Sequence, residues 1–247
     1  MATLRIGASG WSYRHWKDRF YPSGTPQKTW LEFYASRFDT VEINASFYYL
    51  PAAATFASWR ERTPPGFLFA VKAPRQITHW RRLLNSEQAV EVFLERAYRL
   101  KDKLGPILFQ LPPRWPADPP RLKSFLALLP RKLRCAFEFR DPSWFSEEIL
   151  ALLRTHGIAL CRSSSNGFPD LDAVTAPFVY LRMHGGRHGP EYSRAELVSW
   201  AQQVANWLAD SLDVYVYFNN DANAYALHNA QTLASLLDLQ PAPSLSH

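Results

Sequence analysis

The chain has 247 residues, of which 47% are hydrophobic, and it carries a formal net charge of +6. This length suits one α/β barrel or two small domains, and the positive charge favours an anionic partner, although it also aids solubility. No apolar run reaches the roughly 18 residues of a membrane span, and the N-terminus lacks a secretory signal pattern. We therefore expect a cytoplasmic protein without a membrane partner. Cys135 and Cys161 lie in apolar runs, which favours reduced core thiols over a zinc site or a disulfide.

Eight short runs have the pattern of β-strands, and helical patterns fill most of the gaps between them. The strand-like runs are Leu4–Ser9, Thr40–Asn44, Phe67–Lys72, Pro106–Leu111, Arg134–Arg140, Ile158–Arg162, Phe178–His184 and Val214–Asn219. The helical segments are Lys28–Phe38, Ala52–Arg62, Glu87–Lys103, Pro120–Leu129, Ser146–Thr155, Ser193–Ala209 and Asn223–Leu237. The gap after the sixth strand, residues 163–177, predicts an irregular connection with little or no helix.

Strands that alternate with helices predict parallel βαβ units, and eight such units in about 240 residues are typical of a closed (β/α)8 TIM-type barrel. A doubly wound open α/β sheet is the alternative, but no GxGxxG fingerprint follows the first strand. Because no linker or fixed-period repeat divides the chain, we predict a single domain over residues 1–247. Its core should cover about residues 4–237, with a disordered tail at 238–247.

Three helix ends carry local signals. Ser146 and Ser193 stand where N-caps are expected, and Glu196 completes the spacing of a capping box with Ser193. Gly157 follows a Leu-rich segment where a C-cap is expected. These signals support the helices that follow the fifth and seventh strands.

Alternation along the strands predicts which side chains face the barrel lumen. The uniformly apolar set should pack under the helices: Val41, Ile43, Phe69, Val71, Phe109, Leu111, Phe137, Phe139, Leu181, Met183, Val216 and Phe218. The other set faces inward and becomes polar toward the C-terminal ends of the strands. It comprises Ser9, Glu42, Asn44, Lys72, Gln110, Glu138, Arg140, Arg182, His184, Asn219 and, just beyond the last strand, Asp221, with Arg162 or Ser163 from the sixth strand.

Ionisable side chains inside a barrel are costly unless they pair or serve a ligand. Barrel enzymes keep their chemistry at the C-terminal face of the strands, which is where these residues gather. We therefore predict a charged functional pocket there. The alternative is an internal network of salt bridges that joins Glu42 and Glu138 to Lys72, Arg140 and Arg182.

The loops after the strands supply aromatic rings, cations and glycines. The segment after the first strand mixes Trp11 and Tyr13 with basic residues, which suits a nucleobase, a sugar or a phosphate ester, or merely plugs the barrel mouth. Arg75 and His79 follow the third strand. The glycine-rich loop that begins at Gly185 follows the seventh strand, close to where barrel phosphate sites often form.

The chain resembles the domain-of-unknown-function-72 (YecE-like) family. The resemblance rests on the segments IGASGWSYRHWKDRFYP, LEFYASRFDTVEINASFYYLP, FAVKAPRQITH, LGPILFQLPP, FEFRDPSWF, VYLRMHGG and VYVYFNNDANAYALHNA, which span most of residues 4–237. It implies a TIM-barrel fold and no established reaction. Family members commonly carry an Asp soon after the sixth strand, whereas this chain has no carboxylate there before Asp170. If that Asp takes part in the chemistry, activity is lost or altered here.

The family's motif positions coincide here with the polar strand ends and loops described above. They are Gly10, Trp11, Tyr13, Glu42, Asn44, Tyr48, Lys72, His79, Gln110, Glu138, Arg140, Trp144, Arg182, His184, Gly185, Asn219, Asn220 and Asp221.

Our first functional hypothesis is an enzyme that acts on a phosphate-bearing ligand, a nucleotide or a nucleic acid, with phosphodiester hydrolysis as one candidate reaction. Its catalytic residues would be Glu42, Lys72, Glu138, Arg140, His184 and Asp221. Its ligand-binding residues would be Trp11, Tyr13, Asn44, Tyr48, Arg75, His79, Gln110, Trp144, Arg182, Gly185, Asn219 and Asn220.

Two other functions stay open. One is a non-catalytic barrel that binds an anionic metabolite or single-stranded nucleic acid. The other, less favoured, is a glycoside hydrolase that uses Glu42 and Glu138. These residues lie three strands apart, which is a wide separation for the two carboxyl groups of a retaining enzyme, normally ~5 Å apart. The sequence identifies no cofactor. Carboxylates and His184 would suit a divalent metal, but no HxxxH or HxH spacing supports one.

Overall fold

The computed structural model describes residues 2–165 and 167–238. Its strands are β1 (Leu4–Ala8), β2 (Thr40–Ile43), β3 (Leu68–Lys72), β4 (Leu104–Gln110), β5 (Cys135–Glu138), β6 (Ala159–Ser164), β7 (Phe178–Met183) and β8 (Asp213–Phe218). Hydrogen-bonded neighbours run parallel in the order β1-β8-β7-β6-β5-β4-β3-β2. Eight parallel strands in a nearly closed ring confirm the predicted (β/α)8 TIM-type barrel.

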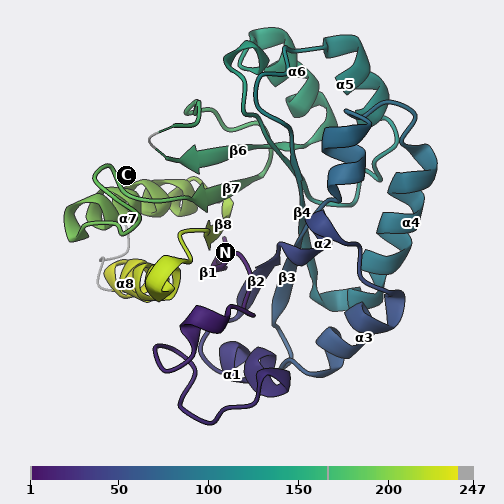
Figure 1. Cartoon of the computed structure of the whole chain (residues 1–247). Coiled ribbons are helices and arrows are strands. Elements are labelled where there is room, and N and C mark those ends of the chain that lie inside the picture. The colour runs from purple at the N-terminus through teal and green to yellow at the C-terminus, as the bar shows by residue number, and fades with distance from the viewer. Residues whose placement is uncertain (1, 166, 239–247) are drawn as a thin grey trace.

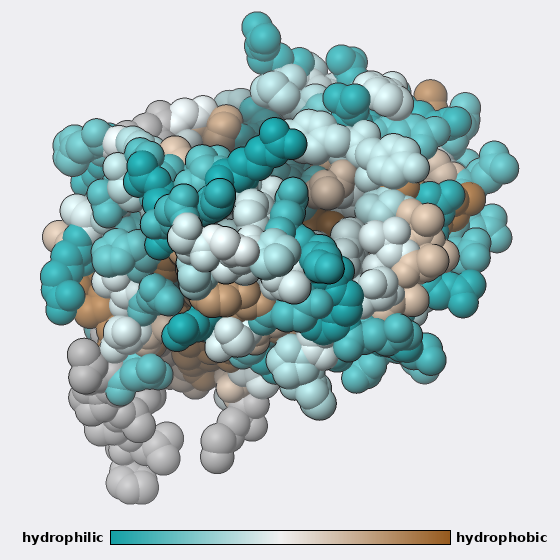
Figure 2. Space-filling model, turned by 60° about the horizontal axis from the view of Figure 1, so that its bottom comes forward, coloured by the Kyte–Doolittle hydropathy of each residue, from teal (hydrophilic) through white to brown (hydrophobic). Residues whose placement is uncertain are grey.

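The longer helices surround the strands as an outer ring (Figure 1). The helices are α1 (Trp30–Ala35), α2 (Ala45–Tyr48), α3 (Ala53–Glu61), α4 (Glu87–Ala97), α5 (Pro119–Leu126), α6 (Glu147–His156), α7 (Arg194–Ala209) and α8 (Tyr225–Asp238). Hydrophilic side chains predominate on the outer face in Figure 2, and apolar ones occupy small recessed areas. The predicted tail falls outside the described residues, except Asp238, which ends α8.

The predicted helix ends are confirmed. Ser146 accepts a hydrogen bond from the Ile149 amide at 3.4 Å, and Ser193 and Glu196 form the reciprocal capping box. Gly157 adopts a left-handed backbone with φ +65° at the end of α6. The described part of the connection between β6 and β7 contains no helix, as the sequence predicts.

Two predicted helices are longer than the ones that form. The segment 28–38 contains only the short α1, preceded by a 3-10 turn. In the segment 87–103, α4 ends at Ala97 and gives way to 3-10 structure that includes Lys101 at φ +52°. Both extensions lie at helix ends, where alternative hydrogen-bonding patterns compete most easily.

Side chains divide between the outer core and the lumen as strand alternation predicts. The residues assigned to the helix-facing side are buried in one large core between strands and helices. The lumen holds a separate cluster of small and aromatic side chains, among them Ala70, Leu108, Ala136, Cys161, Tyr180 and Tyr217. Cys135 and Cys161 are both free and buried. The lumen is therefore packed below the polar strand ends and is not a pore.

The barrel closes between β1 and β2 through few contacts. Within the described chain, the one backbone bridge between these strands joins Ser9 to Glu42. Below it, the Tyr34 hydroxyl accepts from the Ala8 amide at 2.8 Å and donates to the Thr40 carbonyl at 3.0 Å. The hydroxyl thus replaces a missing backbone hydrogen bond. We call this junction the β1–β2 seam.

Candidate functional site

A buried ion cluster occupies the C-terminal ends of β2, β5 and β7. Arg182, only 1% exposed, lies between Glu42 and Glu138, both fully buried. Its guanidinium donates to Glu42 at 2.8 and 3.0 Å and to Glu138 at 2.8 Å. The Tyr180 hydroxyl donates to Glu42 at 2.7 Å, and Ser9 donates to the same carboxylate. A buried ion pair is tolerable only when its partners are also hydrogen-bonded, and this cluster meets that condition.

Both carboxylates are held in the ionised form. Burial alone would raise the pKa of Glu42, but the Arg182 guanidinium outweighs burial and lowers it. The same balance holds the pKa of Glu138 well below its usual range, with further support from His184 and Arg140. Neither carboxylate is therefore protonated at neutral pH, so neither has a proton to give as a general acid.

Around Glu138, the predicted inward residues of three strands meet. Arg140 forms an ion pair with Glu138 Oε1, and His184 Nε2 lies 3.3 Å from the same oxygen. The Asn219 amide lies 3.1 Å from His184 Nδ1. A neutral imidazole satisfies both contacts when Nδ1 accepts and Nε2–H donates. Burial lowers the pKa of His184 despite the carboxylate, so this neutral form predominates at pH 7.

Lys72, at the end of β3, is a buried cation without a hydrogen-bonding partner. It is 5% exposed, and within the described chain its ammonium group makes no hydrogen bond or ion pair. The ammonium group instead lies over the face of Phe47, whose ring centroid is 4.1 Å from Nζ. Burial and the Arg182 charge lower the pKa of Lys72 to about 7, against the opposing pull of Glu42 and Glu138. Near neutral pH, this amine therefore exists in both protonation states.

We expect Lys72→Met to raise the free energy of unfolding at pH 7 by about 2 kcal/mol. The unfolded lysine takes a proton below its ordinary pKa of 10.5, whereas the folded one takes it only near pH 7. Protonation thus favours the unfolded chain between these values, and wild-type stability rises with pH there. Urea denaturation at pH 7 and at about pH 9 should show the gain shrinking at the higher pH.

The matched control is Lys103, which is also buried but donates to the Arg60 carbonyl and to the carbonyl and hydroxyl of Thr63. Lys103→Met leaves these carbonyls unpaired and should destabilise the protein. A stability gain for Lys72→Met that grows with pH, or no gain at all, would contradict the assignment of a strained ammonium.

Arg75 and His79 extend the positive charge toward the surface. The Arg75 guanidinium makes no hydrogen bond or ion pair within the described residues and lies 5.7 and 5.0 Å from the rings of Tyr48 and Trp80. Burial, followed by the charges of Lys72, Arg140 and Arg75, lowers the pKa of His79 to about 4. The side of the mouth formed by β3 therefore has an excess of positive charge.

A cavity of about 850 Å³ opens at the C-terminal mouth beside this charge. Six of its lining residues are ones that the sequence predicts: Trp11, Tyr13, Asn44, Tyr48, Asn219 and Asp221. Trp59 from α3 completes the wall and meets Trp11 edge to face at 5.1 Å. Asn44 Oδ1 is buried and has no hydrogen-bonding partner in the described part of the chain, so the cavity offers both ring faces and an unused acceptor.

The predicted residues of the ion cluster and its charged surroundings do not line this cavity: Glu42, Lys72, Arg75, His79, Glu138, Arg140, Arg182 and His184. Four further predicted residues also lie outside it, in other parts of the fold. Trp144 is buried against Phe139 in the outer core and donates to the Trp115 carbonyl at 2.7 Å. Asn220 donates to the Pro190 carbonyl and to Asn229, which ties the loop after β7 to α8. The Gly185 amide donates to the Tyr192 hydroxyl at 3.1 Å. Gln110 ends β4 beside Glu138 and is half-buried.

The sixth strand resolves the choice between Arg162 and Ser163. Arg162 points outward, where it pairs with Asp170 and Asp172 and lies 5.7 Å from the Trp207 ring of α7. Ser163 aligns with Arg182 in the neighbouring strand, and its buried hydroxyl has no partner among residues 2–165 and 167–238. Asp170, the first carboxylate after β6, is therefore engaged outside the lumen.

Several residues of the site do not appear among the sequence-based candidates. Tyr180 precedes Arg182 by two positions, so alternation within β7 could have identified it. Phe47 and Trp59 look like ordinary core residues in the sequence. Phe168, from the helix-free loop, lies 3.4 Å from the Arg140 guanidinium and 5.3 Å from the His184 ring. No sequence signal predicts that contact.

Metal binding and membrane insertion receive no structural support within residues 2–165 and 167–238. No group of three or more His, Cys, Asp or Glu side chains in these residues is arranged to hold a metal ion. Arg182 occupies the space between the fully buried carboxylates of Glu42 and Glu138. No described helix combines the length and apolar character needed to cross a bilayer.

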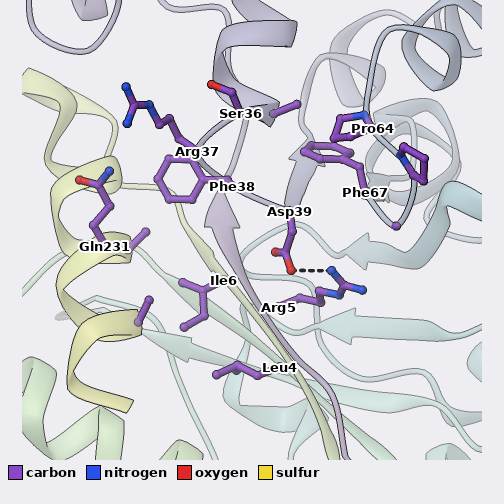
Figure 3. Close-up of a pocket in the computed structure, with 15 residues that line it drawn as sticks. Leu4, Arg5, Ile6, Ser36, Arg37, Phe38, Asp39, Pro64, Phe67 and Gln231 are labelled. Atoms are coloured by element: carbon purple, nitrogen blue, oxygen red, sulfur yellow. Dashed lines mark hydrogen bonds and ion pairs between the residues drawn. The ribbon is translucent and has the colours of Figure 1, made fainter. Parts of the chain in front are cut away.

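A second cavity of about 550 Å³ lies at the opposite, N-terminal end of the barrel. Figure 3 shows its walls, which come from the start of β1, the segment after α1, the turn before β3, and α8. Arg5 and Asp39, which both line this cavity, form an ion pair with 2.5 Å between the guanidinium nitrogen and the carboxylate oxygen. Of the two cations that line it, Arg5 pairs with Asp39 and Arg37 lies 5.7 Å from the Phe33 ring, so this cavity has a smaller group of cations than the C-terminal mouth.

The fold and the site together define a TIM-type barrel with a buried ion cluster at its C-terminal mouth. The profile of the family described as "Protein of unknown function DUF72" matches residues 5–246, and the chain belongs to this family. It is 28% identical to the UPF0759 protein YunF of Bacillus subtilis (strain 168), over 96% of this chain and 95% of YunF.

Two further proteins are similar. The UPF0759 protein YecE of Escherichia coli (strain K12) is 34% identical over 58% of this chain and 51% of its own length. A crystal structure of a DUF72 family protein from Thermotoga maritima MSB8 superposes with a TM-score of 0.83 at 29% identity, covering 96% of this chain and 99% of that one. The resemblance inferred from the motifs is thereby confirmed. Neither name states an activity.

Proposed function

We propose that this protein is an enzyme that acts on a phosphate-bearing ligand, such as a nucleotide or a nucleic acid, at the C-terminal mouth of the barrel. The observation that carries the proposal is the position of Lys72 and Arg75. They are two cations without a carboxylate partner within the described residues, beside an aromatic-lined cavity. Unpaired cations at a partly buried site favour an anion that supplies the missing charge.

The ligand's phosphate would lie against Lys72, Arg75 and Arg140, and its planar part against Trp11 or Tyr48. Neutral His184 or the neutral form of Lys72 would accept a proton from the attacking group. The guanidinium of Arg182, by contrast, donates its hydrogen bonds to Glu42 and Glu138. Its role is therefore to hold these carboxylates and, through Glu138, to orient His184 and Arg140. Hydrolysis of a phosphodiester is one reaction that this set of groups supports.

A non-catalytic binding barrel is the second candidate, and one observation favours it. Both buried carboxylates are ion-paired and have lowered pKa values, so neither supplies a proton as a general acid. The same observation weighs against glycoside hydrolysis, because that reaction needs one carboxyl group with a raised pKa to protonate the leaving group.

Arg75→Ala should weaken the binding of a phosphate-bearing ligand about ten-fold to a hundred-fold, the loss expected for one charge-assisted contact. Isothermal titration calorimetry with inorganic phosphate and with a panel of nucleotides measures this change. Arg37→Ala is the matched control, since Arg37 lies 5.7 Å from a single ring, Phe33, and lines the cavity at the other end of the barrel. Equal affinities in both variants and the wild type would refute the site.

Turnover separates the enzyme from the binding barrel. Products of a phosphate-ester panel are followed by mass spectrometry with the wild type and with Lys72→Met. An enzyme should lose turnover in this variant while it still binds ligand through Arg75 and Arg140. A wild-type protein that binds these compounds and converts none of them would establish the binding barrel instead.

A further inference from the structure

The barrel contains two buried lysines, Lys72 and Lys103, whose ammonium groups have different surroundings. Lys103 Nζ donates to three oxygen atoms at 2.6, 2.7 and 3.1 Å, one for each of its protons. Lys72 Nζ donates to none within the described chain, and its neighbour is the face of Phe47. A structural ammonium needs its protons satisfied, whereas a nucleophilic amine needs a free lone pair. Lys103 fits the first description, and Lys72 fits the second.

The surroundings of Lys72 are also those of a reaction site. Its strand end lies at the C-terminal mouth, and Phe47 belongs to α2, the same short helix that supplies Tyr48 to the cavity wall. His79 and His184 are neutral side chains near the same charge cluster and are able to carry protons. Arg75 makes no ion pair within the described residues, and Arg140, which pairs with Glu138, is among the charges that act on the Lys72 amine.

We infer that Lys72 is a nucleophile that forms an imine with the carbonyl carbon of a phosphorylated aldehyde or ketone. The inference rests on the proposed phosphate site and narrows its ligand to a carbonyl compound. The phosphate binds Arg75 and Arg140, which positions the carbonyl carbon at Nζ. An adjacent cation and a dry, apolar wall keep part of the amine unprotonated, as they do in other lysine nucleophiles.

The step balances without an oxidant or a reductant. The lone pair of neutral Nζ forms the C–N bond, and the carbonyl oxygen takes up a proton, which gives a carbinolamine. This intermediate then loses water, and a C=N bond remains. The oxygen of that water comes from the carbonyl group, and the neutral amine gives up two protons in all. Once protonated, the imine withdraws electrons from the neighbouring carbon, so bond cleavage or proton transfer at that carbon becomes easier.

Borohydride trapping tests the inference on the full chain. The protein is incubated with pyridoxal 5′-phosphate, an aldehyde that carries both a phosphate and an aromatic ring, and in parallel with glyceraldehyde 3-phosphate. Sodium borohydride then reduces any imine to a stable secondary amine, and peptide mass spectrometry locates it. We expect labelling at Lys72 at least about ten-fold above that at Lys103 and at the average surface lysine.

Two controls separate the phosphate from the carbonyl. Pyridoxal, which lacks the phosphate, should label Lys72 about ten-fold less, and inorganic phosphate should suppress labelling by the phosphorylated probes. Arg75→Ala should reduce labelling by those probes, whereas Arg37→Ala should not. Equal labelling of Lys72 by pyridoxal and by pyridoxal 5′-phosphate would overturn the assigned substrate class.

The inference and the proposed function fail in different ways. If calorimetry detects phosphate binding that depends on Arg75, but Lys72 is labelled no more than Lys103, the nucleophile is refuted and the phosphate site stands. If neither binding nor labelling depends on these residues, both are refuted.

Discussion

Arg182→Met should cost at least about 5 kcal/mol of unfolding free energy, the largest loss that we expect from any single substitution in the site. The substitution leaves the Glu42 and Glu138 carboxylates without their shared guanidinium, in a region where neither has any solvent exposure. Tyr180 and Ser9 still donate to Glu42, but hydrogen bonds from neutral groups replace only part of the lost interaction. A buried carboxylate without a cationic partner either takes up a proton or is hydrated by water that enters the barrel.

Arg162→Met is the matched control, because Arg162 is a buried arginine on the adjacent strand that also binds two carboxylates. Its partners Asp170 and Asp172 retain 27% and 64% side-chain exposure, so water replaces the lost contacts. Urea denaturation of both variants should give a loss of only about 1–2 kcal/mol for Arg162→Met. If Arg182→Met does not fold, Arg182→Lys, which keeps one charge, should fold with an intermediate loss. Equal losses at positions 162 and 182 would refute the central role of Arg182.

The loss should also depend on pH in a defined direction. In the wild type, Arg182 lowers the pKa of both glutamates, so their contribution to stability is present above the ordinary carboxyl range and disappears as the pH falls through their lowered pKa values. Without Arg182, burial dominates and raises these pKa values. The variant should therefore gain stability on mild acidification, whereas the wild type should not.

Strand alternation predicted most of this site before the fold was known. Each strand is buried on both sides, and its polar residues occur at the C-terminal ends of the lumen-facing set, so a period of two locates Glu42, Lys72, Glu138 and Arg182 on one face. Parallel pairing then brings the ends of β2, β3, β5 and β7 to the same mouth. This step needs only the strand count and a closed barrel.

Alternation does not predict which cation pairs with which carboxylate. In the sequence, Lys72, Arg140 and Arg182 are equivalent candidates, and an internal salt-bridge network was the alternative to a site. The structure contains both: Arg182 and Arg140 neutralise the glutamates, whereas Lys72 and Arg75 are left without a carboxylate among the described residues. The length of each side chain and the stagger between strands determine which cation contacts which carboxylate, and neither follows from spacing along the chain.

Contacts made by loops and short helices were the hardest to predict. Phe168 reaches Arg140 from a segment without periodicity, and the role of Tyr34 depends on where a six-residue helix lies against two strands. The sequence pattern of residues 28–38 gives no indication of this role for Tyr34. Its use as a hydrogen-bonding bridge across the β1–β2 seam follows from the gap between those strands, which is a property of the closed barrel.

The β1–β2 seam provides the second large effect. Gly7→Ala should reduce the unfolding free energy by about 3–5 kcal/mol, through overpacking and the loss of seam hydrogen bonds. A Cβ atom on Gly7 would lie 2.3 Å from the Thr40 carbonyl oxygen and 2.9 Å from the Tyr34 hydroxyl. The carbonyl belongs to the backbone of β2 and cannot rotate away, so the two strands must separate.

Separation of the strands should also disturb the proposed functional site, since the bridge between Ser9 and Glu42 lies at the C-terminal end of the same seam. Gly7→Ala is therefore expected to weaken phosphate binding as well as stability, whereas Gly189→Ala, whose new Cβ would meet nothing within 4 Å, should change stability little. Urea denaturation and phosphate calorimetry on the two variants measure both effects. Tyr34→Phe, which removes the bridging hydroxyl without adding bulk, should lose about 1–3 kcal/mol. A Gly7→Ala protein as stable as Gly189→Ala would mean that the barrel tolerates an open seam, and the link from the seam to Glu42 would be wrong.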